Sequence, residues 1–449
     1  MKILDFIFRR HERADAQRIW KERVTDYAQA INVHVARSRA GNGKRAGRQP
    51  AEPRVSHLIG EALKAVRTAN SSGDLEGLRD QWPPAHAPFV PLLEANGQSI
   101  PVVCLLDDGS ILARIGAPWE DGRTVRISGA DVEPLPEIGM FGQCPNRRYF
   151  AVAGTENVVV RDGWQGDVIS TCPWPTGLEG LPEDLHCVPF DTPPVATRLI
   201  PFPDGQRVLL VSVSGIFVLS ATGAVRLLPD EKDIEEYAEW APDEYPEGIP
   251  VPGLSMEHGT VSKSGRFIAT GSQDRVHFIF DSELNLVGEV GPMSEYPHYA
   301  LFSSDDSVIA LNSCHFYNGK TRCVATDLLP GLEIPGWEED PRAPVIDDVA
   351  RVYAGVARDD EFIIGDAFGY VRAFSVDGDF RWEVFIGSSI CDIDLATDSG
   401  TLVVSTYAGF ISVIDLDVGK QPDHQIGIGG HAERYRWLFW KDEERPLRW

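Results

Sequence analysis

Two hydrophobic patterns divide the chain near residue 85. In the first 48 residues, apolar positions recur every three or four residues, which is the spacing of one face of an α-helix. This stripe consists of Trp20, Val24, Tyr27, Ala28, Ile31 and Val35. Shorter helical patterns follow at Ser56–Ala69 and Asp74–Gln81, and Trp82-Pro83-Pro84 ends the second of them. The sequence therefore predicts a helical N-terminal segment over residues 1–85.

From about residue 90 onward, short β-branched and aromatic runs replace the helical period. Asp-Gly, Ser-Gly, Asp-Asp or Thr-Gly turns separate these runs. One unit has strand patterns at Ala196–Phe202, Arg207–Val213, Gly215–Ala221 and Ala224–Leu228. Units of this kind recur at intervals of about 50 residues, seven in all. They begin near residues 90, 141, 196, 259, 299, 352 and 391. The pattern predicts an all-β fold, a seven-bladed β-propeller over residues 90–449.

One of these units resembles a known blade repeat. In Phe362–Trp382, Gly369-Tyr370 opens a strand, Asp377-Gly378 makes the next turn, and Trp382 follows. This arrangement is similar to the repeat of pyrroloquinoline-quinone-type propellers. The other units resemble loose WD-type repeats without the Gly-His and Trp-Asp dipeptides. The resemblance implies the fold but no cofactor, because the quinone enzymes use a vicinal disulfide and calcium ligands, and this chain has no adjacent cysteines.

Charge and cysteine content narrow the kinds of partner and compartment. The chain has 67 acidic and 42 basic residues, a formal net charge of −25. Only the first 48 residues are basic, at +7 (12 Lys or Arg against 5 Asp or Glu), and they include the break Gly41–Arg48. An acidic body repels phosphate backbones, so we expect no nucleic-acid partner. The apolar run at the start is too short and too interrupted for a signal peptide. No stretch approaches the roughly 20 apolar residues of a membrane span.

The seven cysteines include no Cys-x-x-Cys pair, which favours free thiols in a reducing compartment. We therefore expect a cytoplasmic protein with no membrane partner. Catalytic signatures are missing as well: there is no G-x-S-x-G elbow, no H-E-x-x-H and no P-loop. Cys314 and His315 are adjacent on a predicted strand and would face opposite ways, which disfavours a shared metal ion. The sequence assigns no catalytic residue, metal ligand or cofactor.

Three long insertions carry the informative chemistry. Trp174–Pro194, Asp230–Ile249 and Glu333–Asp348 are each expected to link the last strand of one blade to the first strand of the next. Such links emerge on one face of a propeller. The insertions contain 4, 9 and 6 acidic residues against 0, 1 and 1 basic ones, with aromatic residues among them. The candidate partner-binding residues are Trp174, Glu235, Glu236, Tyr237, Trp240, Asp243, Glu244, Tyr245, Trp337, Glu338, Glu339 and Asp340.

Two interpretations of this acidic, aromatic-rich face compete. Acidic loops can simply keep a large protein soluble. Alternatively, exposed Trp and Tyr are typical binding anchors, and concentrated negative charge attracts a cationic partner. The second interpretation predicts a non-enzymatic interaction module or scaffold for a basic protein, for example an immunity-type inhibitor of a toxin. An enzyme, a hydrolase or lyase acting at the mouth of the central channel, is the alternative. The sequence leaves the oligomeric state open.

The aromatic tail Arg434–Trp440 also has two possible uses. Its alternation fits a strand with Tyr435, Trp437 and Phe439 on one face. Such a strand could close the ring by pairing with an early strand, or it could cover the helical segment.

Overall fold

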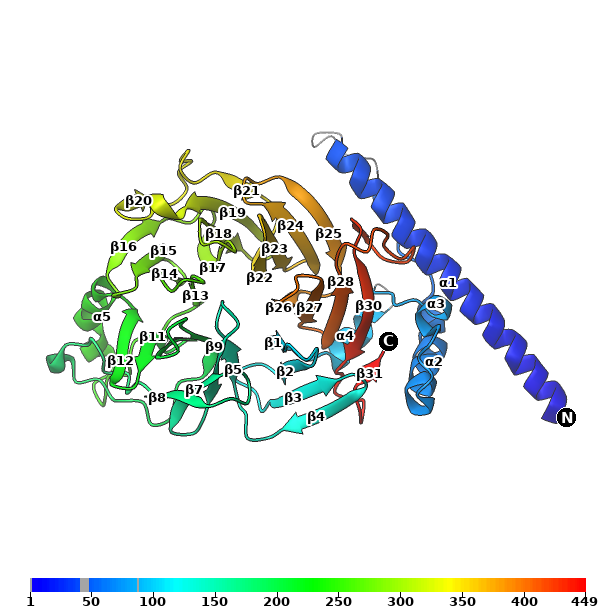
Figure 1. The fold of residues 1–449 in the computed structure, drawn as a ribbon, viewed down its shortest axis with the longest axis horizontal. Helices are drawn as coiled ribbons and strands as arrows, with labels where there is room; N and C mark the ends of the chain where they lie inside the picture. The colour runs from blue at the N-terminus through cyan, green and yellow to red at the C-terminus, as the bar shows by residue number, and fades with distance from the viewer. Residues whose placement is uncertain (1, 41–47, 87–88) are drawn as a thin grey trace.

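Seven sheets, each built on four antiparallel strands, surround a central axis in the computed structural model, which describes residues 2–40, 48–86 and 89–449 (Figure 1). We number these blades in chain order. Each has four strands in sequence order, and the first strand of each lies nearest the axis. The prediction of a seven-bladed propeller preceded by helices is confirmed for the described residues.

Each of the first three blades consists of four strands that are consecutive in the sequence. Blade 1 consists of β1 (Val102–Leu105), β2 (Ile111–Ile115), β3 (Arg123–Ser128) and β4 (Asp131–Leu135). Blade 2 consists of β5 (Phe141–Gln143), β6 (Tyr149–Ala153), β7 (Asn157–Asp162) and β8 (Val168–Pro173). Blade 3 consists of β9 (Ala196–Pro201), β10 (Arg207–Ser212), β11 (Gly215–Ser220) and β12 (Gly223–Leu228).

Blades 4, 6 and 7 each have a short fifth strand at the outer edge, whereas blade 5 has four strands. Blade 4 has β13 (His258–Val261), β14 (Phe267–Gly271), β15 (His277–Asp281), β16 (Leu286–Val290) and β20 (Leu332–Ile334). Blade 5 has β17 (Tyr296–Phe302), β18 (Val308–His315), β19 (Asn318–Ala325) and β21 (Val345–Asp347). Blade 6 has β22 (Val352–Arg358), β23 (Glu361–Asp366), β24 (Tyr370–Ser375), β25 (Phe380–Phe385) and β29 (Gly427–Ile428). Blade 7 has β26 (Ile390–Leu395), β27 (Thr401–Thr406), β28 (Phe410–Asp415), β30 (Ala432–Leu438) and β31 (Leu447–Arg448).

Packing between blades explains the continuous apolar runs of the middle strands. Along β10, Val208 and Leu210 pack into a cluster shared with blade 2, whereas Leu209 and Val211 pack into a cluster shared with blade 4. Successive side chains of a strand point to opposite faces, so a sheet buried on both faces needs apolar residues at every position. No single blade can bury both of its faces, and the ring is therefore the stable unit.

The predicted helical stripe packs against the outer side of the ring. Trp20, Val24, Ala28 and Ile31 of α1 (Lys2–Ala40) are buried, as their spacing predicts. The segment continues with η1 (Ser56–Leu58), α2 (Ile59–Ser72), α3 (Leu78–Gln81) and α4 (Val90–Asn96). α4 occupies residues where the sequence suggested the first blade, whose first strand begins at Val102. The predicted basic break is Gly41–Arg48, and its residues 41–47 lie outside the described part of the chain. None of the described helices has the length and apolar composition needed to cross a bilayer.

Side-chain packing closes the ring between blades 7 and 1. β30 pairs with β28 of its own blade and not with an early strand. Trp437 and Phe439 pack with the core of blade 1, whereas Leu438 and Trp440 point the other way and pack with Trp20 in the helical segment. The tail therefore covers the helical segment, the second of the two predicted uses. At the axis, Asp392 and Asp394 of β26 accept hydrogen bonds from the N–H groups of Val103 and Leu105 at 2.9 and 2.6 Å.

Two sequence assignments in blade 5 are wrong. The sequence pattern suggests a third strand of this blade at His315–Asn318. Instead, His315 pairs with Asn318, and Phe316-Tyr317 forms a two-residue turn between the eight-residue strands β18 and β19. Glu333–Asp348 is not a link between blades, because it begins within β20 and contains β21, the fourth strand of blade 5. The turn could not be recognised from the sequence, because its two central residues are aromatic and not the Gly or Asn typical of two-residue turns.

Candidate recognition face

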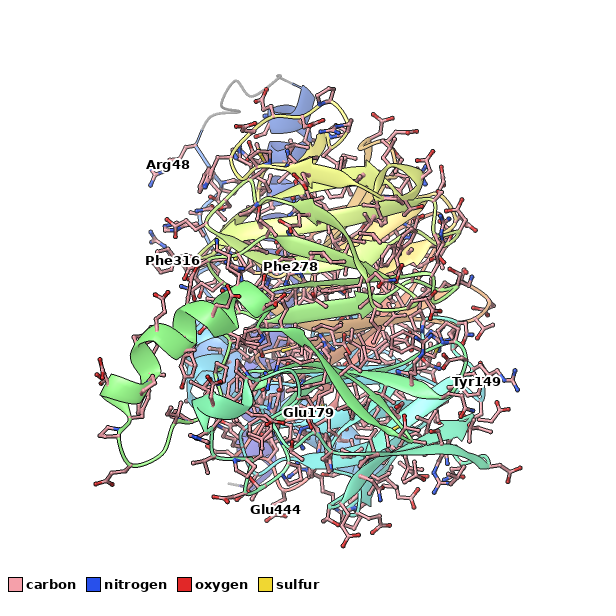
Figure 2. All side chains as sticks on the ribbon, turned by 90° about the vertical axis from the view of Figure 1, so that its left-hand side faces the viewer. Arg48, Tyr149, Glu179, Phe278, Phe316 and Glu444 are labelled. Carbon is pink, nitrogen blue, oxygen red and sulfur yellow. The ribbon has the colours of Figure 1, made fainter. Side chains whose placement is uncertain are left out.

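One face of the disc collects the turns between second and third strands and the links between blades. This follows from the antiparallel order, because both kinds of connection start from the same end of the strands. Figure 2 shows α5 (Glu231–Glu244), in the link after blade 3, on the same side as Phe316, in the second turn of blade 5. Tyr149, which follows the first turn of blade 2, lies on the opposite side.

All exposed aromatic side chains among those that the structure describes lie on this face. Seven of the eight occupy its turns and links. The eighth, Trp337, lies between β20 and β21. Its backbone N–H donates to the carbonyl of Pro292 at 2.8 Å, and Pro292 lies in the link between blades 4 and 5. The set is Trp119, Trp240, Tyr245, Phe316, Tyr317, Trp337, Phe368 and Tyr407. We call this side the aromatic face.

The second insertion contains α5, which the sequence analysis treated as a loop. Asp230 caps the helix, because its side chain accepts a hydrogen bond from the N–H of Asp233 at 2.9 Å. Ile234 and Ala241 are its buried residues, and Pro242 lies near its end. Ile234, Tyr237, Ala238 and Ala241 recur at three- and four-residue spacing, which is a helical pattern that the sequence analysis overlooked.

Three aromatic rings cluster at the exposed end of α5. The ring of Trp240 lies 5.0 Å from that of Tyr237 and 6.2 Å from that of Tyr245. Trp240 is nevertheless 49% exposed. The Tyr237 hydroxyl donates to the carbonyl of Pro250 at 2.8 Å, which fixes its ring. The cluster thus presents a largely rigid aromatic surface surrounded by the carboxylates of α5.

The first and second insertions pack into one unit. Leu185, from the 3-10 turn η3 (Glu183–Leu185), shares a small apolar cluster with Ala241 and Ile249. The backbone of Val188 donates to the carbonyl of Ile249 at 2.8 Å. Each insertion therefore buries part of the other, which fixes the position of α5 relative to blade 3.

Arginine side chains from the blades hold all three insertions. Arg226 of β12 donates to the carbonyls of Gly177 and Glu179 at 2.5 and 2.8 Å. Arg322 of β19 donates to the carbonyls of Gly291 and Glu338 at 3.1 and 2.8 Å. A guanidinium has five donors in a fixed fork, which suits it to clamp loop carbonyls.

The third clamp, Arg275, pairs with Asp230 and Asp233 at 2.7 and 3.3 Å. Burial and the Asp230 carboxylate raise the pKa of Asp233 to about 6, although Arg275 opposes this. Near pH 6 this helix end therefore gains or loses a charge. In the third insertion, hydrogen bonds and charge from Arg342 instead lower the pKa of Asp340 to about 2.

The predicted partner-binding residues fall into three groups. Most are exposed: Glu235, Glu236, Trp240, Asp243, Glu244, Tyr245, Trp337, Glu338 and Glu339. Tyr237 and Asp340 are half-buried, and Asp340 is bonded to Arg342. Trp174 is half-buried too: its indole N–H donates to the carbonyl of Gly154 at 3.0 Å, and its ring packs on the core shared by blades 2 and 3.

Sequence reasoning missed an aromatic arc across blades 5 to 7. Tyr317 lies 6.0 Å from Phe368, and the ring of Tyr353 lies 5.4 Å from that of Tyr407. The first pair joins blades 5 and 6, and the second joins blades 6 and 7. Phe316, Tyr317, Phe368 and Tyr407 all stand in tight turns, where small polar residues are usual. Large aromatic residues in turns were the available signal.

The central channel forms a cavity of about 590 Å³. Arg198 pairs with Asp392 at 3.0 Å, and Arg147 pairs with Asp394 at 2.5 Å, so arginines from blades 2 and 3 bind the carboxylates of blade 7. Within the described ranges no group of three or more His, Cys, Asp or Glu side chains is placed to hold a metal ion.

No protein-family model matches the chain, and no curated protein matches it significantly.

Proposed function

We propose that the protein is a non-enzymatic interaction module that binds a basic protein partner through the aromatic face. One observation carries the proposal: all eight exposed aromatic residues of the described part lie on the face that also bears the acidic insertions. Solvating loops need carboxylates but not exposed Trp, Tyr or Phe, so mere solubility does not explain the combination.

The two kinds of residue have separate roles in this proposal. The first two insertions hold 13 acidic residues and 1 basic residue, and Glu338 and Glu339 of the third are exposed. These charges attract a cationic protein at long range and speed its association. Trp240, Trp337 and the arc of Tyr317 and Phe368 supply apolar contact area once the partner is bound. The arginine clamps reduce the entropy lost on binding, because they hold the insertions in place beforehand.

The same surface suits an immunity-type inhibitor or a scaffold. A toxin that acts on an anionic substrate such as nucleic acid has a basic active site, which an acidic propeller face could occlude. The proposal also includes a cytoplasmic location. It further assigns blade 6 to the pyrroloquinoline-quinone-type repeat and the other blades to the WD type. The turn after Asp366, whose carboxylate accepts from the N–H groups of Phe368 and Tyr370 at 2.8 and 3.0 Å, supports the repeat type.

An enzyme acting at the channel remains the second candidate. Its support is the polar cavity, but the carboxylates there are engaged. Asp392 is bonded to Arg198 and to the N–H of Val103, and Asp394 to Arg147 and to the N–H of Leu105. A general acid or base in this channel would have to exchange such a structural bond for one to substrate.

Affinity capture from the native cell, followed by mass spectrometry, tests the proposal. We expect a basic protein in stoichiometric amount that is released by salt and is not retained by Trp240→Ala. A small molecule or metal ion retained without any protein would instead favour the enzyme.

A further inference from the structure

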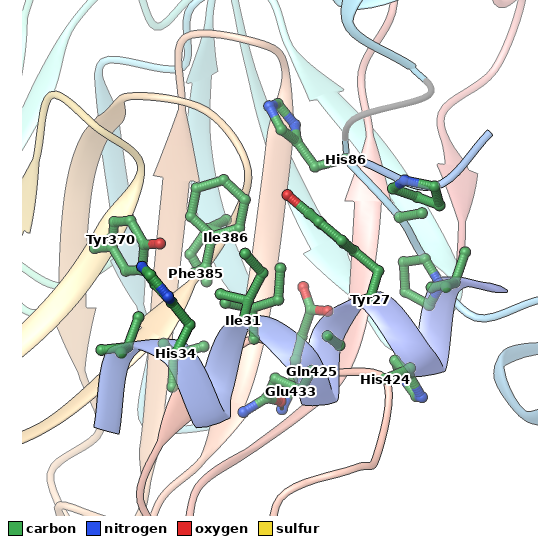
Figure 3. A pocket seen from close by; sticks show the side chains of 18 of the residues that line it. Tyr27, Ile31, His34, His86, Tyr370, Phe385, Ile386, His424, Gln425 and Glu433 are labelled. Carbon is green, nitrogen blue, oxygen red and sulfur yellow. Dashed lines mark hydrogen bonds between the residues drawn. The ribbon is translucent and has the colours of Figure 1, made fainter. Parts of the chain in front are cut away.

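A partly open cavity lies between α1 and the outer side of the ring. It has a volume of about 630 Å³ and is bounded by α1, the segment Pro84–His86, strands β24 and β25, and the connection before β30. Figure 3 shows Ile31 of α1 opposite Phe385 and Ile386 of blade 6. A volume of this size falls within the roughly 300–1000 Å³ of sites for drug-sized ligands.

Aromatic and aliphatic groups form most of the walls. The ring of Phe385 lies 4.8 Å from that of Tyr370 and 5.3 Å from that of His86. Val24 and Ile31 line the opposite wall. A flat ring placed between these walls would contact aromatic faces and edges on one side and branched aliphatic groups on the other, an arrangement that favours aromatic ligands.

Four polar groups at this cavity have free hydrogen-bonding capacity. Tyr27 and Tyr370 direct their hydroxyls into the space from opposite sides, with no hydrogen-bond partner among the described residues (Figure 3). His86 Nδ1 and His424 Nε2 are buried and likewise unpartnered among the described residues. Buried polar atoms without partners are rare in folded proteins, and a missing ligand is one explanation for them.

These four groups are uncharged at neutral pH. Burial, helped by Arg436, lowers the pKa of His86 to about 4, and burial, helped by Arg79, does the same for His424. Of the charged groups at the cavity, Arg39 pairs with Glu383 at 2.5 Å. Glu52 lines the cavity as well, and burial together with its carboxylate raises the pKa of Tyr27. Glu433 accepts from Arg79 at 2.6 Å and from Arg436 at 2.8 Å.

We propose that this cavity binds an uncharged heteroaromatic small molecule, whose ring packs on Phe385 and whose edge hydrogen-bonds to Tyr27 and Tyr370. Such a ligand contacts both α1 and blade 6, so it stabilises the docked position of α1. This inference does not depend on the proposed partner at the aromatic face.

Calorimetric titration of the full chain with defined probes tests the inference. Indole-3-carboxamide and adenine are neutral heteroaromatic probes, indole-3-acetate is a charged analogue, and decanoate is an acyl chain without a ring. We expect one of the neutral probes to bind more tightly than the two anions. Tyr27→Phe and Tyr370→Phe should each weaken that binding by about three- to tenfold, the effect of one hydrogen bond.

A pair of valines in α1 supplies a matched control. Val35 lines the cavity, whereas Val33 is exposed and does not. Val35→Trp should fill the space and weaken binding at least about tenfold, and Val33→Trp should leave it unchanged. The inference is overturned if neither neutral probe binds, if both tryptophan variants bind like the wild type, or if decanoate binds in preference to the rings.

Discussion

Arg275 and Asp230 form an ion pair at 2.7 Å that joins blade 4 to the start of α5. Asp230 uses its other oxygen to cap the helix at the N–H of Asp233. One carboxylate thus caps the N-terminus of the helix and also binds it to blade 4. The acidic helix that carries Trp240 is in this way fixed on the aromatic face.

Loss of this pair should loosen α5 and leave the propeller intact. Arg275→Met keeps much of the apolar stem but leaves two carboxylates without their cation, at a cost of about 1–2 kcal/mol. We expect faster amide hydrogen exchange over 231–244 and unchanged exchange in blade 3. Lys232→Met, in the exposed first turn of the same helix, is the control and should have no such effect. Uniformly faster exchange across the blades would show that Arg275 supports the whole ring instead.

Asp233 should destabilise the protein at neutral pH. Its pKa is raised to about 6 in the folded protein, against roughly 3.9 in an unfolded chain. Between these values the folded state binds more protons, so the free energy of unfolding falls as pH rises from about 4 to about 6. Asp233→Asn should therefore be more stable than the wild type at pH 7, by on the order of 1 kcal/mol, and not at pH 4.

Urea unfolding at both pH values measures this difference. Asp243→Asn, an exposed carboxylate of the same helix, should change stability by less than about 0.5 kcal/mol at either pH. A variant Asp233→Asn that is less stable than the wild type at pH 7 would mean that its bond to Arg275 outweighs the burial.

Replacing a buried tryptophan by alanine should lower the stability of the protein much more than replacing an exposed one. Trp440 packs with Phe89 and Phe410 and donates to the carbonyl of Ala408 at 3.2 Å. Trp440→Ala should cost about 3–5 kcal/mol and release the helical segment. Trp119, 72% exposed on the aromatic face, should tolerate alanine within about 0.5 kcal/mol. Thermal unfolding of the two variants checks this, and equal losses would contradict the assignment of Trp119 as a free surface residue.

In the native protein, Cys187 should react with a thiol reagent faster than the other six cysteines. All seven cysteines are free, and six are buried, whereas Cys187 is half-buried. Burial raises the pKa of Cys144 and of Cys323 to about 12, which suppresses their thiolates. Titration with a thiol reagent should show one fast group in the native protein and seven in denaturant without reductant. Cys187→Ser should abolish the fast phase, and a total of five or fewer thiols would contradict free cysteines.

The repeat and its strands could be predicted because each blade is buried on both faces. Apolar runs such as Val208–Val211 and turn pairs such as Asp204-Gly205 specify strands and turns locally. The buried stripe of α1 was likewise visible from spacing alone. Outside α5 the insertions follow no such rule, because their few buried residues, such as Leu185 and Ile249, pack against one another and not in a period.

The candidate face was only partly predictable for a related reason. The acidic insertions were visible as composition, but Trp119, Phe368 and Tyr407 are single residues in turns. That they share a face depends on the topology of all seven blades. The helix α5 had two usable sequence signals: Asp230 is a favoured N-cap residue, and Ile234, Tyr237, Ala238 and Ala241 have helical spacing.

The binding kinetics of the captured partner test the central claim most directly. We expect Trp240→Ala and Trp337→Ala each to speed dissociation by about 30-fold, equivalent to about 2 kcal/mol, without lowering the melting temperature. Neutralising Glu235, Glu236, Asp243 and Glu244 should slow association about tenfold and remove its salt dependence. Neutralising four exposed acidic residues at connections on the opposite face, Asp131, Asp167, Glu283 and Asp327, should do neither. If Trp240→Ala destabilises the fold and leaves both rate constants unchanged, the aromatic face is packing surface and the account is wrong.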